Sequence, residues 1–352
     1  MNTQSLGLNR INTIVFVLAL AFSVLGNAQI SVGPKHIGKP GKFKKENIEK
    51  FKKTKTIFVL SNQYEKEVYE DILKASWTAT PFEVVPVSEF KLRDYLKDEY
   101  SIATLRGHRV DKTTKSGALV HYLYMYLEVI MYQNEELTQK LAENEGKKEK
   151  KLRKIINKHK ISFARFELFP KDEFIKIAIK SSNEEIMAAT MNDDVFFNYQ
   201  PGMLKNYLQK TSQLLNDEKI YWMYEDEELP ELKNLGSTTL YIPDYTKTKY
   251  NAFTMSDKEQ DESKSEKLYA DYEFTHEFIS VKDLNTKILN NEEFYYLRYV
   301  RVNSQKFIEI VNSKSGDVIY RNYETGLAYN LKPKHIKELN KAIKKVIKKA
   351  SK

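Results

Sequence analysis

Three short segments in the first half of the chain recur in the second half at one constant spacing. They are Phe82-Glu-Val-Val-Pro-Val87, Ser88-Glu-Phe90 and Glu99-Tyr100-Ser101, which match His276-Glu-Phe-Ile-Ser-Val281, Lys282-Asp-Leu284 and Glu293-Phe294-Tyr295. The offset is 194 residues in every pair (positions 83 and 277, 90 and 284, 99 and 293). A constant register over some twenty residues, with matching apolar positions, indicates an internal repeat.

The repeat includes an opening strand. Residues 55–60 (KTIFVL) return as residues 238–243 (TTLYIP), offset by 183 when Thr56 is matched to Thr239, so the second copy is expected to hold eleven extra residues before its second strand. Short runs rich in β-branched and aromatic residues are typical of strands buried on both faces, as at the start of an α/β unit.

Periodicity along the chain predicts a mixed α/β fold made of two diverged tandem modules, each with the order β-α-β-α-β-β-β-α. The predicted modules span residues 55–224 and 237–352, joined by a linker at 225–236. A Glu- and Lys-rich stretch at 133–160 is predicted to be a charged helical excursion from the first module, and 257–266 an exposed loop. Within residues 120–132, Tyr122, Tyr124 and Tyr126 are expected to share one strand face.

The N-terminus has the pattern of an export signal. Residues 1–10 end in Arg10, residues 11–25 are almost unbroken apolar, and Gly26-Asn27-Ala28 supplies small residues before Gln29. We predict a signal peptide at 1–28 with cleavage between Ala28 and Gln29, because the apolar run is short for a membrane span; an uncleaved anchor is the alternative. Residues 29–54, with their Gly, Pro and Lys, are predicted to form a flexible arm. A chain without cysteine has no disulfide and no lipid-bearing cysteine, so a periplasmic or extracellular location is expected.

Three sequence features carry a family resemblance. The Asn-Ala sequence before Gln29, the segment Gly202-Met-Leu-Lys-Asn-Tyr-Leu-Gln209 and the segment Thr239-Leu-Tyr-Ile-Pro-Asp244 resemble an uncharacterised exported protein family of Bacteroidetes. The resemblance implies export. The family has no assigned activity, so the resemblance implies no functional residues.

Polar residues that follow the third predicted strand form the best candidate site. Arg106-Gly107-His108-Arg109-Val110-Asp111 is interpreted as a loop at a strand end, where α/β folds tend to bind ligands. Arg106, His108 and Arg109 are therefore the candidate ligand-binding residues, since two guanidinium groups hold an anion well. The alternative is an exposed basic loop. Glycine-rich phosphate loops and closely spaced histidine pairs are missing from the sequence, so we predict no cofactor, no metal and no catalytic residue.

The net charge of the chain is +9, and much of the excess positive charge lies near residues 147–160 and in the last twenty residues. The helix predicted from residue 333 is basic and amphipathic; packing on the sheet is the favoured interpretation, and contact with an anionic membrane is the alternative. Export argues against nucleic acid as a partner. We expect a non-enzymatic binding or scaffold protein of the cell envelope, with an envelope protein or an anionic glycan as partner; the alternative is a hydrolase or transferase with its site near Arg106–Asp111. The oligomeric state is left open.

Overall fold

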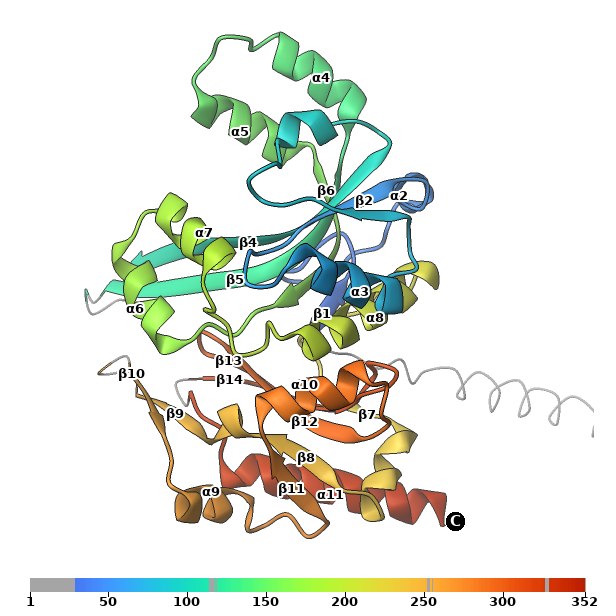
Figure 1. Cartoon of the computed structure of the whole chain (residues 1–352), viewed down its shortest axis with the longest axis vertical. Helices are drawn as coiled ribbons and strands as arrows, with labels where there is room; N and C mark the ends of the chain where they lie inside the picture. The colour runs from blue at the N-terminus through green and yellow to red at the C-terminus, as the bar shows by residue number, and fades with distance from the viewer. Residues whose placement is uncertain are drawn as a thin grey trace, which may run out of the picture.

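Two six-stranded mixed β-sheets, each flanked by helices, make up the chain (Figure 1). The computed structural model describes residues 29–113, 117, 119–251, 254, 256–326 and 329–351. The mixed α/β class expected from the sequence is confirmed. The predicted signal peptide, including Ala28, lies outside the described residues.

The first sheet has the strand order β1-β6-β5-β4-β2-β3. Its strands are β1 (Ile30–Val32), β6 (Lys160–Glu167), β5 (Leu119–Tyr132), β4 (Tyr100–Thr113), β2 (Lys55–Val59) and β3 (Phe82–Val84). The pairs β1–β6, β6–β5 and β5–β4 are antiparallel, and the pairs β4–β2 and β2–β3 are parallel.

The second sheet has the strand order β11-β8-β12-β13-β14-β7. Its strands are β11 (His276–Ile279), β8 (Leu240–Pro243), β12 (Tyr295–Val302), β13 (Gln305–Asn312), β14 (Val318–Thr325) and β7 (Glu227–Glu228). From β7 to β11, this sheet has three antiparallel pairs followed by two parallel pairs. The first sheet has the same pattern from β1 to β3. A separate antiparallel pair is formed by β9 (Thr248–Asn251) and β10 (Ser256–Glu259).

The pairing registers of the two sheets agree with the spacing found in the sequence. Thr56 lies between Phe82 and Ser101 in the first sheet, and Leu240 lies between His276 and Tyr295 in the second. Both flanking strands are thus offset by 194 residues. Thr56 corresponds to Leu240, so the second copy holds ten extra residues before its second strand, one fewer than expected. The duplication itself stays a prediction, supported by this register.

Helices cover both faces of the first sheet. They are α2 (Lys45–Phe51), α3 (Lys66–Ser76), the 3-10 turn η1 (Leu92–Tyr95), α4 (Asn134–Ala142), α5 (Glu149–Lys158), α6 (Asp172–Lys180), α7 (Asn183–Asn192) and α8 (Pro201–Asn216). Helices α4 and α5 project together from one end of the molecule (Figure 1). The second sheet carries η2 (Pro230–Gly236), η3 (Asp244–Lys247), α9 (Glu262–Tyr269), α10 (Val281–Leu289) and α11 (Pro333–Ala350).

Helix α8 joins the two halves. It packs against α3 on one side and α10 on the other (Figure 1). A Cβ atom on Gly202 would lie 2.8 Å from the Oδ1 atom of Asn285, so only glycine allows this approach. The Nζ of Lys205 donates to the carbonyl oxygen of Ile288, and the side chain of Asn206 donates to the carbonyl oxygen of Ser313.

Helix α11 packs on protein along its apolar stripe. Ile336, Leu339 and Ile343 are buried, and the helix lies against η2 and α9. Several of its lysines pair with carboxylates of neighbouring segments: Lys337 with Asp271, Lys344 with Glu273 and Lys345 with Glu228. No helix among the described residues is long and apolar enough to cross a membrane.

The structure differs from the sequence expectations in three segments. Residues 29–54 are not a flexible arm, because β1 pairs with β6 and Ile30 and Val32 are wholly buried; a three-residue strand is too short to give a periodic signal. The expected linker 225–236 holds β7 and η2. The expected loop 257–266 contains parts of β10 and α9, and the side chain of Asp261 caps α9.

Candidate ligand-binding pocket

The segment Arg106–Asp111 lies inside β4 and is not a loop. Strand β4 runs to Thr113 and pairs with β5 from Ile102 to Thr113. Because side chains alternate along a strand, Arg106 and His108 share one face and Arg109 lies on the other. The three candidate residues therefore do not converge on one ligand, and the structure places them in three different surroundings.

Arg109 holds the end of a helix. Its Nη1 donates to the carbonyl oxygens of Ala178, Ile179 and Ser181, each at 2.9 Å. These groups end α6, where carbonyl oxygens lack helical partners and attract a cation. The role of Arg109 is structural.

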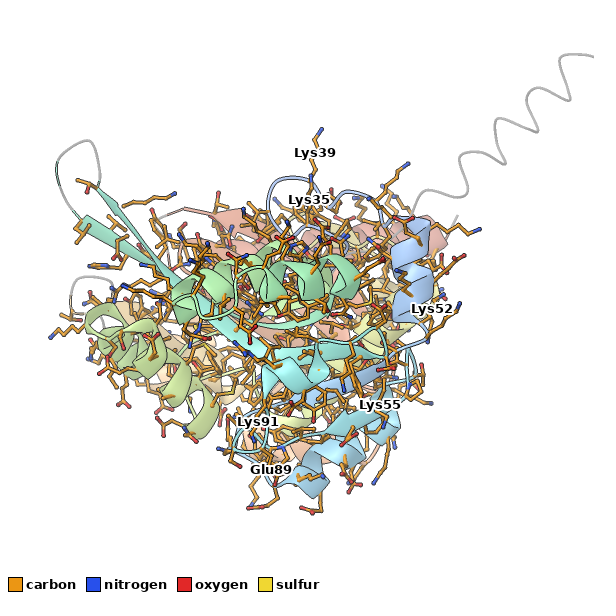
Figure 2. The ribbon with its side chains drawn as sticks, turned by 90° about the horizontal axis from the view of Figure 1, so that it is seen from above. Lys35, Lys39, Lys52, Lys55, Glu89 and Lys91 are labelled. Atoms are coloured by element: carbon orange, nitrogen blue, oxygen red, sulfur yellow. The ribbon has the colours of Figure 1, made fainter. Side chains whose placement is uncertain are left out.

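Arg106 lies at a pocket of about 660 Å³ between β4, η1 and α5. Its Nε is 3.4 Å from the Oε2 of Glu128, and its Nη2 donates to Asn157 at 3.3 Å. Its guanidinium group is therefore held by contacts within the chain. Lys91, which also lines this pocket, extends from the same side of the molecule as Lys55 (Figure 2).

His108 lines a different pocket, of about 440 Å³, which lies between the two halves of the chain. Its walls come from β4, β5 and β6 of the first sheet, from β13 and β14 of the second, and from two loop segments. The lining residues are Ile37, Gly38, His108, Val110, Lys112, Tyr124, Arg165, Trp222, Tyr224, Gln305 and Tyr323. We call this the aromatic pocket.

Five of the eleven lining residues have aromatic rings, and these rings contact one another in two groups. The ring of His108 stacks on that of Tyr124 with 5.2 Å between centroids. Tyr224 meets Trp222 edge to face at 5.1 Å and Tyr323 at 5.4 Å. Rings packed in this way resist reorientation, so they present preformed faces to a ligand.

Arg165 supplies a buried positive charge to the pocket. Only 6% of its surface is exposed, and its guanidinium carbon lies 3.5 Å from the ring centroid of Tyr126. Its Nη2 is 2.6 Å from the Oε1 of Glu167, yet its buried Nε has no hydrogen-bond partner among the described residues. Burial raises the pKa of Glu167, although Arg165 opposes this, so the carboxyl group is a weak counter-charge. Lys112 adds a second cation at the exposed end.

The histidine and the tyrosines of the pocket are uncharged at neutral pH. Burial, helped by the charges of Arg165 and Arg106, lowers the pKa of His108. Burial raises the pKa values of Tyr124, Tyr224 and Tyr323. The walls are therefore neutral, and the formal charges at the pocket are the cations of Arg165 and Lys112.

A buried polar row fixes the loop that borders the pocket. The Nε2 of His36 lies 2.7 Å from the hydroxyl of Ser162, which donates to Glu128 at 2.8 Å, and Lys160 donates to the same carboxylate. Burial lowers the pKa of His36 to about 3. The loop continues from this anchor, so that Lys39 extends outward from the molecule (Figure 2) and Ile37, 77% exposed, lies at the pocket mouth.

The described lining of the aromatic pocket lacks the groups of a catalytic triad. Of the described residues lining the aromatic pocket, none carries a carboxylate or an aliphatic hydroxyl, so His108 has no nucleophile or orienting acid beside it there. Within the described part of the chain, no three His, Asp or Glu side chains are grouped so as to hold a metal ion.

The sequence analysis singled out two residues of this pocket, His108 and Tyr124. It did not identify Arg165, Trp222, Tyr224 or Tyr323. Alternation along β5 did place Tyr124 on the aromatic face. The missed residues come from other strands and from the segment before β7, so only tertiary structure brings them together. Comparison of the chain with protein-family models, with curated proteins and with solved structures gave no match.

Proposed function

We propose that the protein is an exported binding protein of the cell envelope that holds an acidic sugar unit in the aromatic pocket. One observation carries the proposal: a preformed aromatic pocket contains a nine-tenths buried guanidinium group, that of Arg165, with an unpartnered Nε. Export remains a prediction from the N-terminal sequence, and the anionic glycan was one of the partners expected from it.

The chemistry of the lining supports an anionic ring as the ligand. Small-molecule sites combine mostly apolar and aromatic walls with a few polar groups, in volumes of roughly 300–1,000 Å³. The flat faces of Tyr224 and Trp222 suit the apolar face of a sugar ring, and a carboxylate suits Arg165 and Lys112. A cationic ligand is disfavoured by these same two charges, even though aromatic rings alone attract cations.

The hydrolase or transferase alternative has less support. It requires a reactive group within reach of Arg106, His108 or Arg109, and these residues lie in separate surroundings. Binding without reaction is the function that the pocket favours.

Titration with trigalacturonate tests the proposal, with the fully methyl-esterified trisaccharide as the matched uncharged ligand. Tryptophan fluorescence reports binding, because Trp222 lines the pocket and Trp77, the other tryptophan, is buried in the core. We expect binding of the charged trisaccharide and weaker binding of the ester. Lys112→Gln should weaken binding of the charged form by roughly three- to fivefold, the size of an exposed charge contact, and leave the ester unaffected.

Tyr323→Leu should weaken binding of both trisaccharides, since it removes a wall and no charge. Lys53→Gln, at an exposed lysine outside the pocket lining, is the control and should change neither affinity. Equal affinity for the acid and the ester, or equal effects of the Lys112 and Lys53 substitutions, would contradict the proposed role of charge.

A further inference from the structure

Gln29, the first described residue, is wholly buried between the two sheets. Its backbone N–H donates to the Oε1 of Glu309 in β13 at 2.5 Å. Its side-chain carbonyl accepts a hydrogen bond from the hydroxyl of Tyr207 in α8 at 2.5 Å, and its Nε2 donates to the carbonyl oxygen of Glu167 in β6. Each polar atom of the side chain thus has a partner from the folded core.

Two positively charged side chains already lie near the backbone nitrogen of Gln29. The carboxylate of Glu309 accepts from the Nε of Arg298 at 2.8 Å and from the Nε of Arg321 at 3.1 Å, and all three residues are at most 1% exposed. A backbone N–H fits there as a neutral donor. Arg321 also pairs with the buried carboxylate of Glu227 at 3.4 Å, so two carboxylates already balance the two arginines. A free α-ammonium group at the same place would be a third cation without an anion of its own, which is costly.

We propose that removal of the predicted signal peptide leaves Gln29 as the mature N-terminus and that Gln29 is then converted to pyroglutamate. The proposal rests on the export part of the proposed function. In this step the α-amino nitrogen attacks Cδ of the side-chain amide, a C–N bond forms, and the Cδ–Nε2 bond breaks. The side-chain nitrogen leaves as ammonia after taking up a proton from the amine, so the step needs no other reactant.

The product suits the site. The lactam nitrogen keeps one hydrogen and donates it to Glu309 without carrying charge. The lactam carbonyl is the former side-chain carbonyl and still accepts from Tyr207. Loss of Nε2 leaves no buried acceptor unpaired, because the carbonyl oxygen of Glu167 also accepts from the Nδ2 of Asn198 at 3.0 Å. Since Gln29 is buried in the fold, the reaction precedes docking of β1.

Mass spectrometry of the N-terminal peptide, from protein isolated from exporting cells, is the first test. We expect a peptide that begins at residue 29 and is lighter by one ammonia. A free amine at Gln29 would overturn the cyclisation and leave export standing. A chain that starts at another residue beyond the signal would overturn this proposal alone, whereas one that retains residues 1–28 would contradict export as well.

Thermal unfolding between pH 9 and pH 6 is the second test, on refolded chains that begin at Gln29 in linear or cyclised form. The groups around the amine are Glu309, Arg298, Arg321, Glu227, Glu167 and Tyr207, and both chains share them. An α-amine has a pKa near ~8 when unfolded, and burial beside two arginines lowers the pKa in the fold. The linear chain should therefore lose stability as pH falls below ~8, by about tenfold in its folding equilibrium constant per pH unit.

The cyclised chain should lack this additional loss. Gln29→Ala keeps the amine and cannot cyclise, so it should follow the pH dependence of the linear chain. Identical pH dependence of the linear and cyclised chains would show that the free amine is tolerated, and would overturn the physical basis of the proposal.

Discussion

Replacing Glu309 with glutamine should destabilise the protein severely. Glu309 is 0% exposed, and its two oxygens bind the guanidinium groups of Arg298 and Arg321. The substitution keeps the size of the side chain but removes the charge, leaving two buried arginines with only Glu227 as a nearby carboxylate partner, on Arg321. Breaking a buried pair in this way costs roughly 3–5 kcal/mol, because the remaining charge stays desolvated.

The measurement is thermal unfolding followed by circular dichroism at neutral pH. A loss of that size should lower the unfolding midpoint by roughly 4–7 °C in a chain of this length, because the unfolding entropy is about 2.1 cal/mol/K per residue. Glu293→Gln is the matched control, since Glu293 and Lys314 form an ion pair 3.0 Å apart with both side chains more than half exposed. It should cost less than about 1 kcal/mol. Equal midpoints for the Glu309 and Glu293 variants would refute the argument that the buried carboxylate balances its two arginines.

Three further perturbations follow from the contacts described above. Gly316→Ala should cost roughly 1–3 kcal/mol, because φ is +74° and the added Cβ would lie 2.6 Å from the carbonyl oxygen of Asn206; an unchanged unfolding midpoint would contradict this. His36 is neutral in the fold, because its pKa is lowered to about 3. The free energy of unfolding should therefore decrease as pH falls below ~6.5, by about 2 kcal/mol at pH 5. His36→Phe should flatten this pH dependence between pH ~6.5 and pH ~5, and an unchanged slope would contradict the assignment to His36. Arg109→Met should speed amide hydrogen exchange at the end of α6 without altering binding in the aromatic pocket; a loss of binding would give Arg109 a ligand role after all.

Much of the fold could be predicted from the sequence because short apolar runs are local patterns. The apolar runs at 55–60 and 238–243 predicted β2 and β8, and the offset of 194 agrees with the positions of the strands that pair with them. Two of the short edge strands, β1 and β7, were missed. Strands β1 and β7 have three and two residues, so their pairing is decided by the edge they meet and not by periodicity.

The candidate site was harder to predict for a related reason. The change from apolar to polar residues at Arg106 suggested the end of a strand, yet β4 continues to Thr113 because β5 pairs with it and other segments cover its polar faces. A polar residue on a long strand gives no sign of whether it will face helix α6, helix α5 or the second sheet. Arg109 faces α6, Arg106 faces α5 and His108 faces the second sheet. Which element each residue faces depends on contacts with residues roughly 50 to 200 positions away in the chain.

The segment from Gln29 to Gly38 connects the two proposals in one physical argument. At its start, Gln29 contacts Glu167 of the first sheet and Glu309 of the second, so this residue helps to hold the halves together. Nine residues later the same segment borders the aromatic pocket, whose walls also come from both halves. A chain end that strains β1 or weakens its pairing with β6 should therefore also weaken ligand binding in the pocket. On this reasoning, the linear chain at pH 6 should bind trigalacturonate more weakly than the cyclised chain, while at pH 9 their affinities should converge; equal affinities at pH 6 would mean that the two sites are energetically independent.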